Sequence, residues 1–160
     1  DMRKLDKEQL PRTVQRYVSL GLASNASLPP ECPPPVLRVD GDNVAKLIRQ
    51  HKLPTERPLV GLMPGAEFGP AKQWPLRYFS EVAQALEKQG VACAIFGSPK
   101  DAGAGEAIKA GCPSAFNLCG KTELVDVVDL LSHCSAAVTN GHRYCCGVWI
   151  NVADYDTAPY

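Results

Sequence analysis

Short apolar runs alternate with helical patterns from residue 58 onward, and this alternation restricts the fold more than any other feature. Four runs have the length and composition of buried strands: residues 58–65, 91–98, 115–122 and 135–140. The segments between them have helical spacing, at about residues 75–88, 101–111 and 122–134. Apolar strands separated by helices are typical of a parallel sheet with helices on its faces. The sequence therefore predicts an α/β fold with a Rossmann-like parallel sheet.

Local patterns also predict where helices begin and which side they bury. Before the first strand, apolar spacing predicts one helix within residues 10–22 and another after Asp42, its predicted N-cap, with an extended proline-rich linker at 25–36. Thr122 is the predicted cap of the last helix. The helix from about Pro75 to Lys88 is expected to bury four side chains: Tyr78, Val82, Ala85 and Leu86.

Composition excludes several classes of protein. Lysine plus arginine and aspartate plus glutamate are equal at 17 each and dispersed, so nucleic acid is not an expected partner. The 7 cysteines have no C-x-x-C spacing, which favours reduced thiols over a metal site or a disulfide framework. The sequence contains no apolar leader and no run long enough to span a bilayer, so we expect a cytoplasmic chain, and the first residues read as a piece of a longer protein.

The loop after the first predicted strand contains the residues most suited to a phosphate. Gly65 and Gly69 let backbone N–H groups approach a ligand, and Lys72 precedes a helix N-terminus, where partial positive charge favours anions. Glu67 is suited to orient Lys72 or to accept from a sugar hydroxyl. The alternative is that Lys72 and Glu67 are solvated and the glycines only permit turns. Trp74, next to Pro75, is better explained as a packing anchor than as a stacking platform.

The loops after the second and third predicted strands offer hydroxyl groups at the same edge of the sheet. Ser98 and Asp101 can bind the hydroxyls of a ribose, which doubly wound folds commonly hold at this place. The alternative is a turn at Ser98 and a helix cap at Asp101. Thr122 and Glu123 have the chemistry of a helix start. A G-x-S-x-G elbow, a P-loop and a strand-end G-x-G-x-x-G fingerprint are all missing from the sequence, which disfavours ATP hydrolysis and hydride transfer.

Three stretches resemble, in order and spacing, the carboxyl-terminal half of the ADP-heptose:lipopolysaccharide heptosyltransferases, glycosyltransferase family 9, and most closely its heptosyltransferase II branch. They are "RPLVGLMPGAEFGPAKQWP", "FGSPKDAGAGEAI" and "NLCGKTELVDVVDLLSHCSAAVTN". The resemblance implies a GT-B glycosyltransferase, in which two Rossmann-like domains face each other and the second binds the nucleotide sugar. It divides the chain into the end of the first domain and a linker (1–56), part of the donor domain (57–140) and a divergent tail (141–160).

The same resemblance implies how the donor is bound. Lys72 would approach the phosphates or the heptose of ADP-heptose as an electrostatic stabiliser, Ser98 would lie by the adenosine and Thr122 by the base, with Gly65 and Glu67 completing the donor site. The donor is a substrate, and neither a cofactor nor a metal is implied. The catalytic base belongs to the first domain, which also takes the lipopolysaccharide acceptor, so this chain alone is expected to be inactive. A parent enzyme would work in the cytoplasm, associated peripherally with the inner face of the inner membrane.

The resemblance stops after Asn140. The family continues with an Asp-Ser-Gly turn and a helix of small residues facing the pyrophosphate, whereas this chain continues "GHRYCCGVWINVADYDTAPY". We expect the family's helix and strand to be missing from the tail, and ADP binding to be weak. Two other functions remain open: a non-catalytic nucleotide-binding or structural fragment, and a GT-B-like nucleotide-sugar epimerase.

Overall fold

The computed structural model describes residues 8–23, 26–29, 31, 37–65, 73–140 and the strand at 147–150. The chain divides into two compact units, Asp1–Arg38 and Val39–Tyr160. Among its described residues, the first unit has the helix α1 (Thr13–Gly21), none of whose residues is buried. The helix predicted within residues 10–22 is confirmed. It begins only after Arg12, whose backbone is extended and whose N–H donates to Gln15 Oε1 at 3.0 Å.

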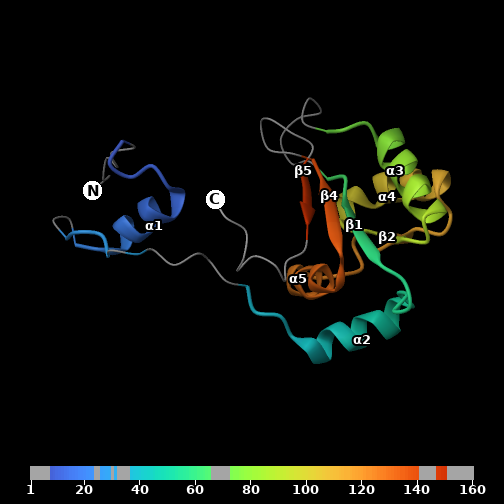
Figure 1. Cartoon of the computed structure of the whole chain (residues 1–160), viewed down its shortest axis with the longest axis horizontal. Helices are drawn as coiled ribbons and strands as arrows, with labels where there is room; N and C mark the ends of the chain where they lie inside the picture. Colours follow the sequence, from blue (N-terminus) through green and yellow to red (C-terminus); the bar gives the residue numbers. More distant parts are fainter. Residues whose placement is uncertain are drawn as a thin grey trace. The chain divides into compact units, whose positions relative to one another are not determined.

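The second unit is built on a five-stranded sheet with the order β3-β2-β1-β4-β5 (Figure 1). The strands are β1 (Leu59–Met63), β2 (Ala92–Ile95), β3 (Phe116–Asn117), β4 (Ala136–Thr139) and β5 (Gly147–Ile150). The first four are mutually parallel, and each lies within one of the four predicted runs. The predicted Rossmann-like parallel sheet is therefore confirmed.

Strand β5 lies in the predicted divergent tail and pairs with β4 in the antiparallel direction. Sequence patterns did not predict it, because four residues are too few to show a recognisable strand period. The other tail residues, including His142, Cys145 and Cys146, lie outside the described residues.

Helices cover both faces of the sheet (Figure 1). They are α2 (Gly41–His51), α3 (Leu76–Lys88), the short 3-10 helix η2 (Pro99–Asp101), α4 (Ala102–Gly111) and α5 (Leu124–His133). Helices α3 and α4 pack on one face and α2 and α5 on the other, so each face has its own apolar core. The cores divide the strands residue by residue, since alternate side chains of a strand point to opposite faces: Val60 and Leu62 belong to one core, Leu59 to the other.

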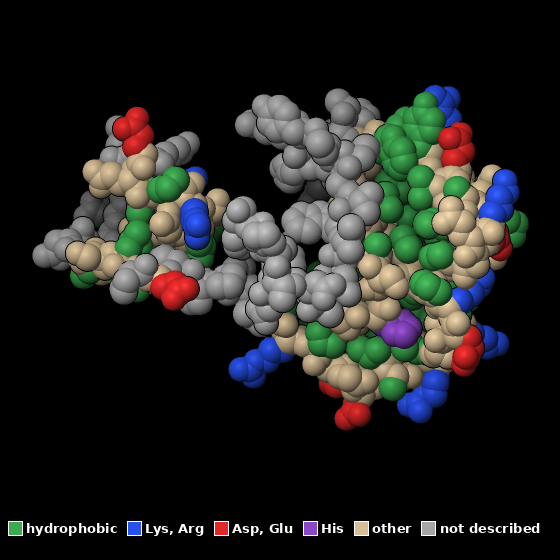
Figure 2. Space-filling model, in the orientation of Figure 1, with side chains coloured by type: hydrophobic (Ala, Val, Ile, Leu, Met, Phe, Trp, Pro, Cys, Tyr) green, Lys and Arg blue, Asp and Glu red, His purple; other side chains and the backbone are tan. Residues whose placement is uncertain are grey.

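Helix α3 is rotated relative to its predicted face. Phe79 and Ala83 are fully buried, whereas Ala85, predicted to point inward, is exposed. Val82 and Leu86 are only partly buried at the edge of the same core. The prediction was wrong for Ala85 and omitted Phe79, the largest of the fully buried side chains, which takes the central position. Hydrophobic side chains over α3 also reach the surface, with charged groups around them (Figure 2).

Two helix caps also differ from the prediction. The cap of α2 is Asp40, whose carboxylate accepts from the N–H groups of Asp42 at 3.0 Å and Asn43 at 3.2 Å. The cap of α5 is Glu123. Its N–H donates to Asp126 Oδ2 at 2.9 Å, and the Thr122 hydroxyl does not take part. In both cases, the cap is the residue whose backbone stays extended at the start of the helix, and neighbouring polar residues can compete for that role.

Four of the cysteines are buried free thiols, namely Cys93, Cys112, Cys119 and Cys134. Burial raises the pKa of Cys93 and Cys134 to about 12 and that of Cys119 to about 11. Because the thiolate is the reactive form, these three side chains are inert core groups at neutral pH.

Candidate functional site

The carboxyl ends of the four parallel strands meet at one edge of the sheet, which we call the carboxyl edge. The residues that follow the strands there are Pro64 and Gly65 after β1, Gly97 and Ser98 after β2, Cys119 and Gly120 after β3, and Asn140 after β4. In open parallel sheets, ligands bind in the crevice outside these ends. The loops that the sequence singled out therefore do come together.

Asp101 lies at the centre of three of these loops. Its Oδ2 accepts from the backbone N–H of Ser98 at 2.8 Å and from the Ser98 hydroxyl at 2.7 Å. A Cβ on Gly65 would lie 3.0 Å from both Asp101 carboxylate oxygens. A Cβ on Gly97 would lie 2.8 Å from Asp101 Cβ and 3.0 Å from Cys119 Sγ. The Asp101 side chain therefore occupies space that a side chain at position 65 or 97 would need, and it fits only because both residues are glycine.

This contact explains Gly65 better than a turn that requires glycine does, and the predicted approach of its backbone N–H to a ligand stays a prediction. Gly65 is not among the residues with positive φ, so no turn requires glycine there. Its hydrogen instead leaves room for the Asp101 side chain. Ser98 is the N-cap of η2, and the Asp101 carboxylate accepts from its N–H and its hydroxyl. Asp101 also occupies the N-cap position of α4, but its side chain makes no cap bond to that helix. The ribose-binding role of the two residues stays a prediction.

Gly120 has a positive φ of 72° and links the loops after β2 and β3. Its N–H donates to Gly97 O at 2.9 Å, and a Cβ there would lie 2.9 Å from Pro99 Cα. Both the left-handed backbone and the close contact require glycine at this position. The turn leads to Thr122, whose Oγ1 is buried and has no hydrogen-bond partner.

Asn140 was treated in the sequence only as the end of a strand, yet it joins both ends of the segment between β1 and α3. Its Nδ2 donates to Pro64 O at 2.6 Å and Gly65 O at 3.2 Å. Its Oδ1 accepts from the backbone N–H of Trp74 at 3.0 Å. The sequence contained one usable signal for this role. Asn140 has an amide side chain and directly follows a predicted strand that ends at the carboxyl edge.

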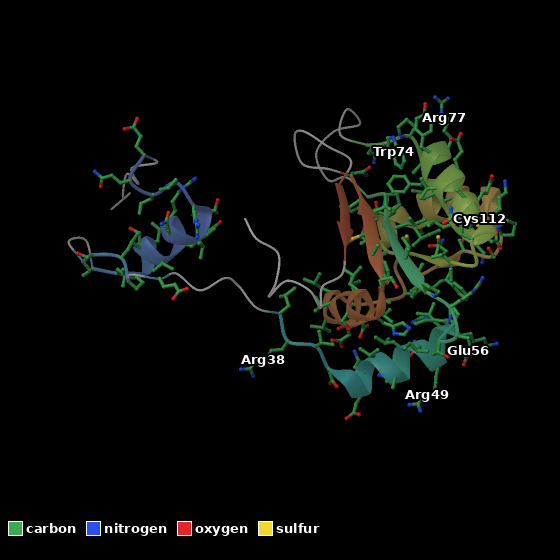
Figure 3. The ribbon with its side chains drawn as sticks, in the orientation of Figure 1. Arg38, Arg49, Glu56, Trp74, Arg77 and Cys112 are labelled. Carbon is green, nitrogen blue, oxygen red and sulfur yellow. The ribbon has the colours of Figure 1, made fainter. Side chains whose placement is uncertain are left out.

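Trp74 is a packing anchor, as the sequence suggested. Its ring stacks on Tyr78 at a centroid distance of 5.4 Å and contacts Phe79 edge-on at 5.1 Å. In Figure 3, Trp74 lies at the start of α3, near Arg77, which donates to the Tyr78 hydroxyl at 2.8 Å. The indole is engaged with its own helix and is not a free surface for a base.

The remaining predicted site residues have different outcomes. Gly65 and Ser98 lie at the carboxyl edge, and Thr122 lies in the turn after β3. Glu67, Gly69 and Lys72 lie outside the described residues, so their predicted roles stay predictions.

An open hollow of about 320 Å³ lies at the opposite edge of the sheet, lined by Arg57, His133 and Ser135 among others. His133 is in the last turn of α5, where a helix C-terminus favours a cation.

Neither a metal site nor a membrane span occurs among the described residues. No cluster of three or more His, Cys, Asp or Glu side chains in that part of the chain has the arrangement of a metal site. Among the helices the structure describes, none combines the length and apolar character needed to cross a membrane.

Four parallel strands covered on both faces, with glycine-rich and hydroxyl-bearing loops gathered at the carboxyl edge, define a Rossmann-like α/β class of domain. The profile of "Glycosyltransferase family 9 (heptosyltransferase)" matches residues 1–141, and the chain belongs to this family.

Known relatives and a solved structure agree with this assignment. Over 150 residues, the chain is 39% identical to lipooligosaccharide heptosyltransferase 2 of Haemophilus influenzae and 40% identical to lipopolysaccharide heptosyltransferase 2 of Escherichia coli. These alignments cover 86% and 88% of this chain and 43% of each relative. The solved structure of E. coli ADP-heptose LPS heptosyltransferase II matches with a TM-score of 0.79 and 39% identity, covering 88% of this chain and 45% of that one. The chain thus spans less than half the length of these relatives, and the predicted resemblance to heptosyltransferase II is confirmed.

Proposed function

We propose that this chain supplies the donor-binding half of a heptosyltransferase that transfers heptose from ADP-heptose to the inner core of lipopolysaccharide. The observation that carries the proposal is the convergence of four strand-end loops at one edge in a member of glycosyltransferase family 9. Two relatives are named as heptosyltransferases, and the name of the E. coli enzyme of known structure includes ADP-heptose.

The donor's phosphates and ribose fit different parts of this edge. We assign the phosphates to the loop with Gly65, Glu67 and Lys72, where a lysine next to a helix N-terminus supplies positive charge. Ser98 suits a ribose hydroxyl: its own proton is donated to Asp101, which leaves the oxygen lone pairs free to accept. We place Thr122 by the base on the family resemblance alone, because its Oγ1 is buried in this chain.

The proposed reaction divides its chemistry between two halves. A base in the acceptor-binding half would deprotonate the attacking hydroxyl, and transfer would invert the anomeric carbon. This half would stabilise the negative charge of departing ADP, with Lys72 as an electrostatic group that moves no proton. The acceptor sugar would be held by the other half, and the parent enzyme would work in the cytoplasm at the inner face of the inner membrane.

An ADP titration of the 160-residue chain tests the donor half directly. Backbone amide shifts should move at Gly65, Gly97 and Gly120 as ADP is added, with a weak dissociation constant. Lys72→Ala should weaken binding roughly tenfold, in line with the loss of one charge-assisted contact. Lys88→Ala is the matched control, because Lys88 ends α3 at the opposite edge of the sheet.

Heptose transfer to a lipopolysaccharide acceptor should not be measurable with this chain, because transfer needs the acceptor and the donor to be held together. ADP-dependent shifts confined to the hollow near His133, or none at all, would overturn the donor-site assignment. If ADP binds at the carboxyl edge and Lys72→Ala does not change its affinity, Lys72 is an ordinary solvated lysine.

A further inference from the structure

The Asn140 side chain connects two parts of the chain that are distant in sequence. Its bonds to Pro64 and Gly65 join residues 76 and 75 positions apart, and its bond to Trp74 joins residues 66 positions apart. Its Nδ2 donates to two carbonyls and its Oδ1 accepts one N–H, so both ends of the carboxamide are used. A single side chain therefore fixes both the residues that leave β1 and the residue that leads into α3.

The two carbonyls that Asn140 contacts belong to the residues just past the end of β1. Pro64 and Gly65 follow the last residue of β1, so their carbonyls lie beyond its sheet pairing. Buried or half-buried backbone carbonyls need hydrogen-bond donors, and Asn140 supplies them. On its other side, Gly65 packs against the Asp101 carboxylate. Gly65 is thus held between two polar side chains from different loops.

The other end of the connection is equally well fixed. Trp74 stands two residues before Leu76, the first residue of α3, and its ring packs on Tyr78 and Phe79 of that helix. A bond from Asn140 to the Trp74 N–H therefore sets where the N-terminus of α3 begins relative to Gly65. Backbone at a glycine and a helix N-terminus are the two features that commonly bind phosphate in such folds.

We propose that Asn140 is a positioning residue for the donor phosphates, which holds Gly65 and the N-terminus of α3 at a fixed separation. The ligand in this inference rests on the proposed function, whereas the Asn140 connection itself does not. Removing the side chain should release both ends together, so that the phosphate-binding backbone is no longer preorganised.

The experiment compares four forms of the 160-residue chain: wild type, Asn140→Ala, Asn140→Asp and Asn43→Ala. Asn43→Ala is the matched control, because Asn43 Nδ2 also makes two bonds, to Asp126 and Asp129, but in the α2–α5 layer. The first readout is the exchange protection of the Trp74 amide without ADP. Measured relative to the core amides of α3, it should fall about tenfold in Asn140→Ala, the order expected for a lost hydrogen bond, and stay at the wild-type ratio in Asn43→Ala.

The second readout is ADP affinity. Asn140→Ala should bind ADP several-fold more weakly than the wild type, and Asn43→Ala should not. Asn140→Asp keeps the acceptor for Trp74 but places a carboxylate oxygen against two carbonyl oxygens. Its affinity relative to wild type should therefore recover as pH falls and the new carboxyl group regains a proton to donate.

The outcomes separate the inference from the proposed function. Unchanged Trp74 protection in Asn140→Ala would overturn the inference, whatever happens with ADP. Lost protection with unaltered ADP affinity would show that Asn140 is structural only. An Asn140→Asp variant whose relative affinity does not change with pH would also count against it. If the wild-type chain binds no ADP, the proposed function is overturned, and the donor part of the inference with it. A loss of Trp74 protection in Asn140→Ala would still show that Asn140 connects Gly65 to Trp74.

Discussion

The two helical layers of the second unit are attached in different ways. Helices α3 and α4 bury Phe79, Ala83 and Ile108 against the sheet and approach each other closely. A Cβ on Gly111 would lie only 2.7 Å from Ser80 Cβ, so the contact between the two helices depends on a missing side chain. Bonds from Gln84 to Gly111 O at 2.7 Å and from Ser80 to Ile108 O at 3.4 Å also join these helices, but they involve no charged group. Shape and volume therefore dominate this layer.

Helices α2 and α5 share an apolar core with the other face, but a polar network joins them. Asn43 Nδ2 donates to Asp126 Oδ1 at 2.9 Å and to Asp129 Oδ2 at 2.8 Å. Asp129 is only 4% exposed, and its Oδ1 also accepts from the Asp40 N–H at 2.9 Å. We infer that the α3–α4 layer responds mainly to changes in volume and the α2–α5 layer mainly to changes in charge and hydrogen bonding.

The largest effect should come from emptying the α3–α4 core. Phe79→Ala is expected to lower the free energy of unfolding by about 3 to 5 kcal/mol, because Phe79 is fully buried and the cavity cannot close completely. Urea denaturation followed by circular dichroism measures this. Tyr17→Ala, at a position 71% exposed on α1, is the control and should change little. A loss below about 1 kcal/mol for Phe79→Ala would contradict the volume-dominated interpretation.

In the α2–α5 layer, Asn43→Ala should cost about 2 to 3 kcal/mol, because two carboxylates lose a donor and Asp129 stays buried. Asn43→Asp should cost more at neutral pH, since it adds a third carboxylate beside two others. Gln50→Ala, on an exposed position of α2, is the control. If Asn43→Ala and Gln50→Ala melt alike, the network does not hold this layer.

Gly111→Ala should destabilise the chain by about 1 to 2 kcal/mol, because the new methyl group overlaps Ser80. Gly103→Ala, in the same helix but with nothing within 4 Å, should instead stabilise it slightly through helix propensity. The double variant Ser80→Gly, Gly111→Ala should lose less stability than the sum of its two single variants, because the two sites are coupled. Equal effects at Gly103 and Gly111 would rule out the close contact as the cause.

The smallest effect should be a pH dependence at the end of α2. Burial, followed by the nearby charge of Lys121, lowers the pKa of His51 from 6.5, although Asp126 acts in the opposite direction. A lowered folded-state pKa means that the unfolded chain binds the proton more readily. The contribution of His51 to the free energy of unfolding is therefore fully present above pH 6.5 and decreases as the pH falls below that value. Measuring the free energy of unfolding of wild type and His51→Gln between about pH 8 and pH 5 tests this, and parallel curves would refute it.

Asp126 gives the same layer a second, more acidic transition. The bond from Asn43 is the main cause that lowers its pKa below 3.8, with the Glu123 N–H bond second. Its contribution is therefore present above pH 3.8 and is lost as pH falls through its lower folded value. The two groups act in separate pH ranges, so their contributions can be measured apart.

Sequence alone predicted the elements of the sheet better than the contacts between them. Continuous apolar runs are a strong local signal, and all four parallel strands were found from them. Caps were less reliable. At α2, Asp40 and Asp42 are both suitable caps, and only the folded chain shows that Asp40 turns back onto the helix. At α5, the cap is Glu123 and not Thr122, because the Asp126 carboxylate accepts a hydrogen bond from the Glu123 N–H.

Residues at the candidate site show the same limit. Placement of Gly65 and Ser98 at the carboxyl edge followed from strand order, because parallel strands end together. The reason for glycine at position 65 could not be predicted in this way. It depends on Asp101, which is distant in sequence and packs against Gly65. Asn140 was missed because its three partners lie 66 or more residues away. No local pattern reports contacts between loops that only folding brings together.

The buried thiols provide each core with its own reporter of opening. Cys93, Cys112 and Cys119 belong to the α3–α4 core and Cys134 to the α2–α5 core. A thiol-specific reagent can modify a buried cysteine only during a fluctuation that exposes it, so the rate of labelling at each site measures how often that core opens. Mass spectrometry of labelled peptides would then give two opening rates from one unmodified chain, without a mutation in either layer.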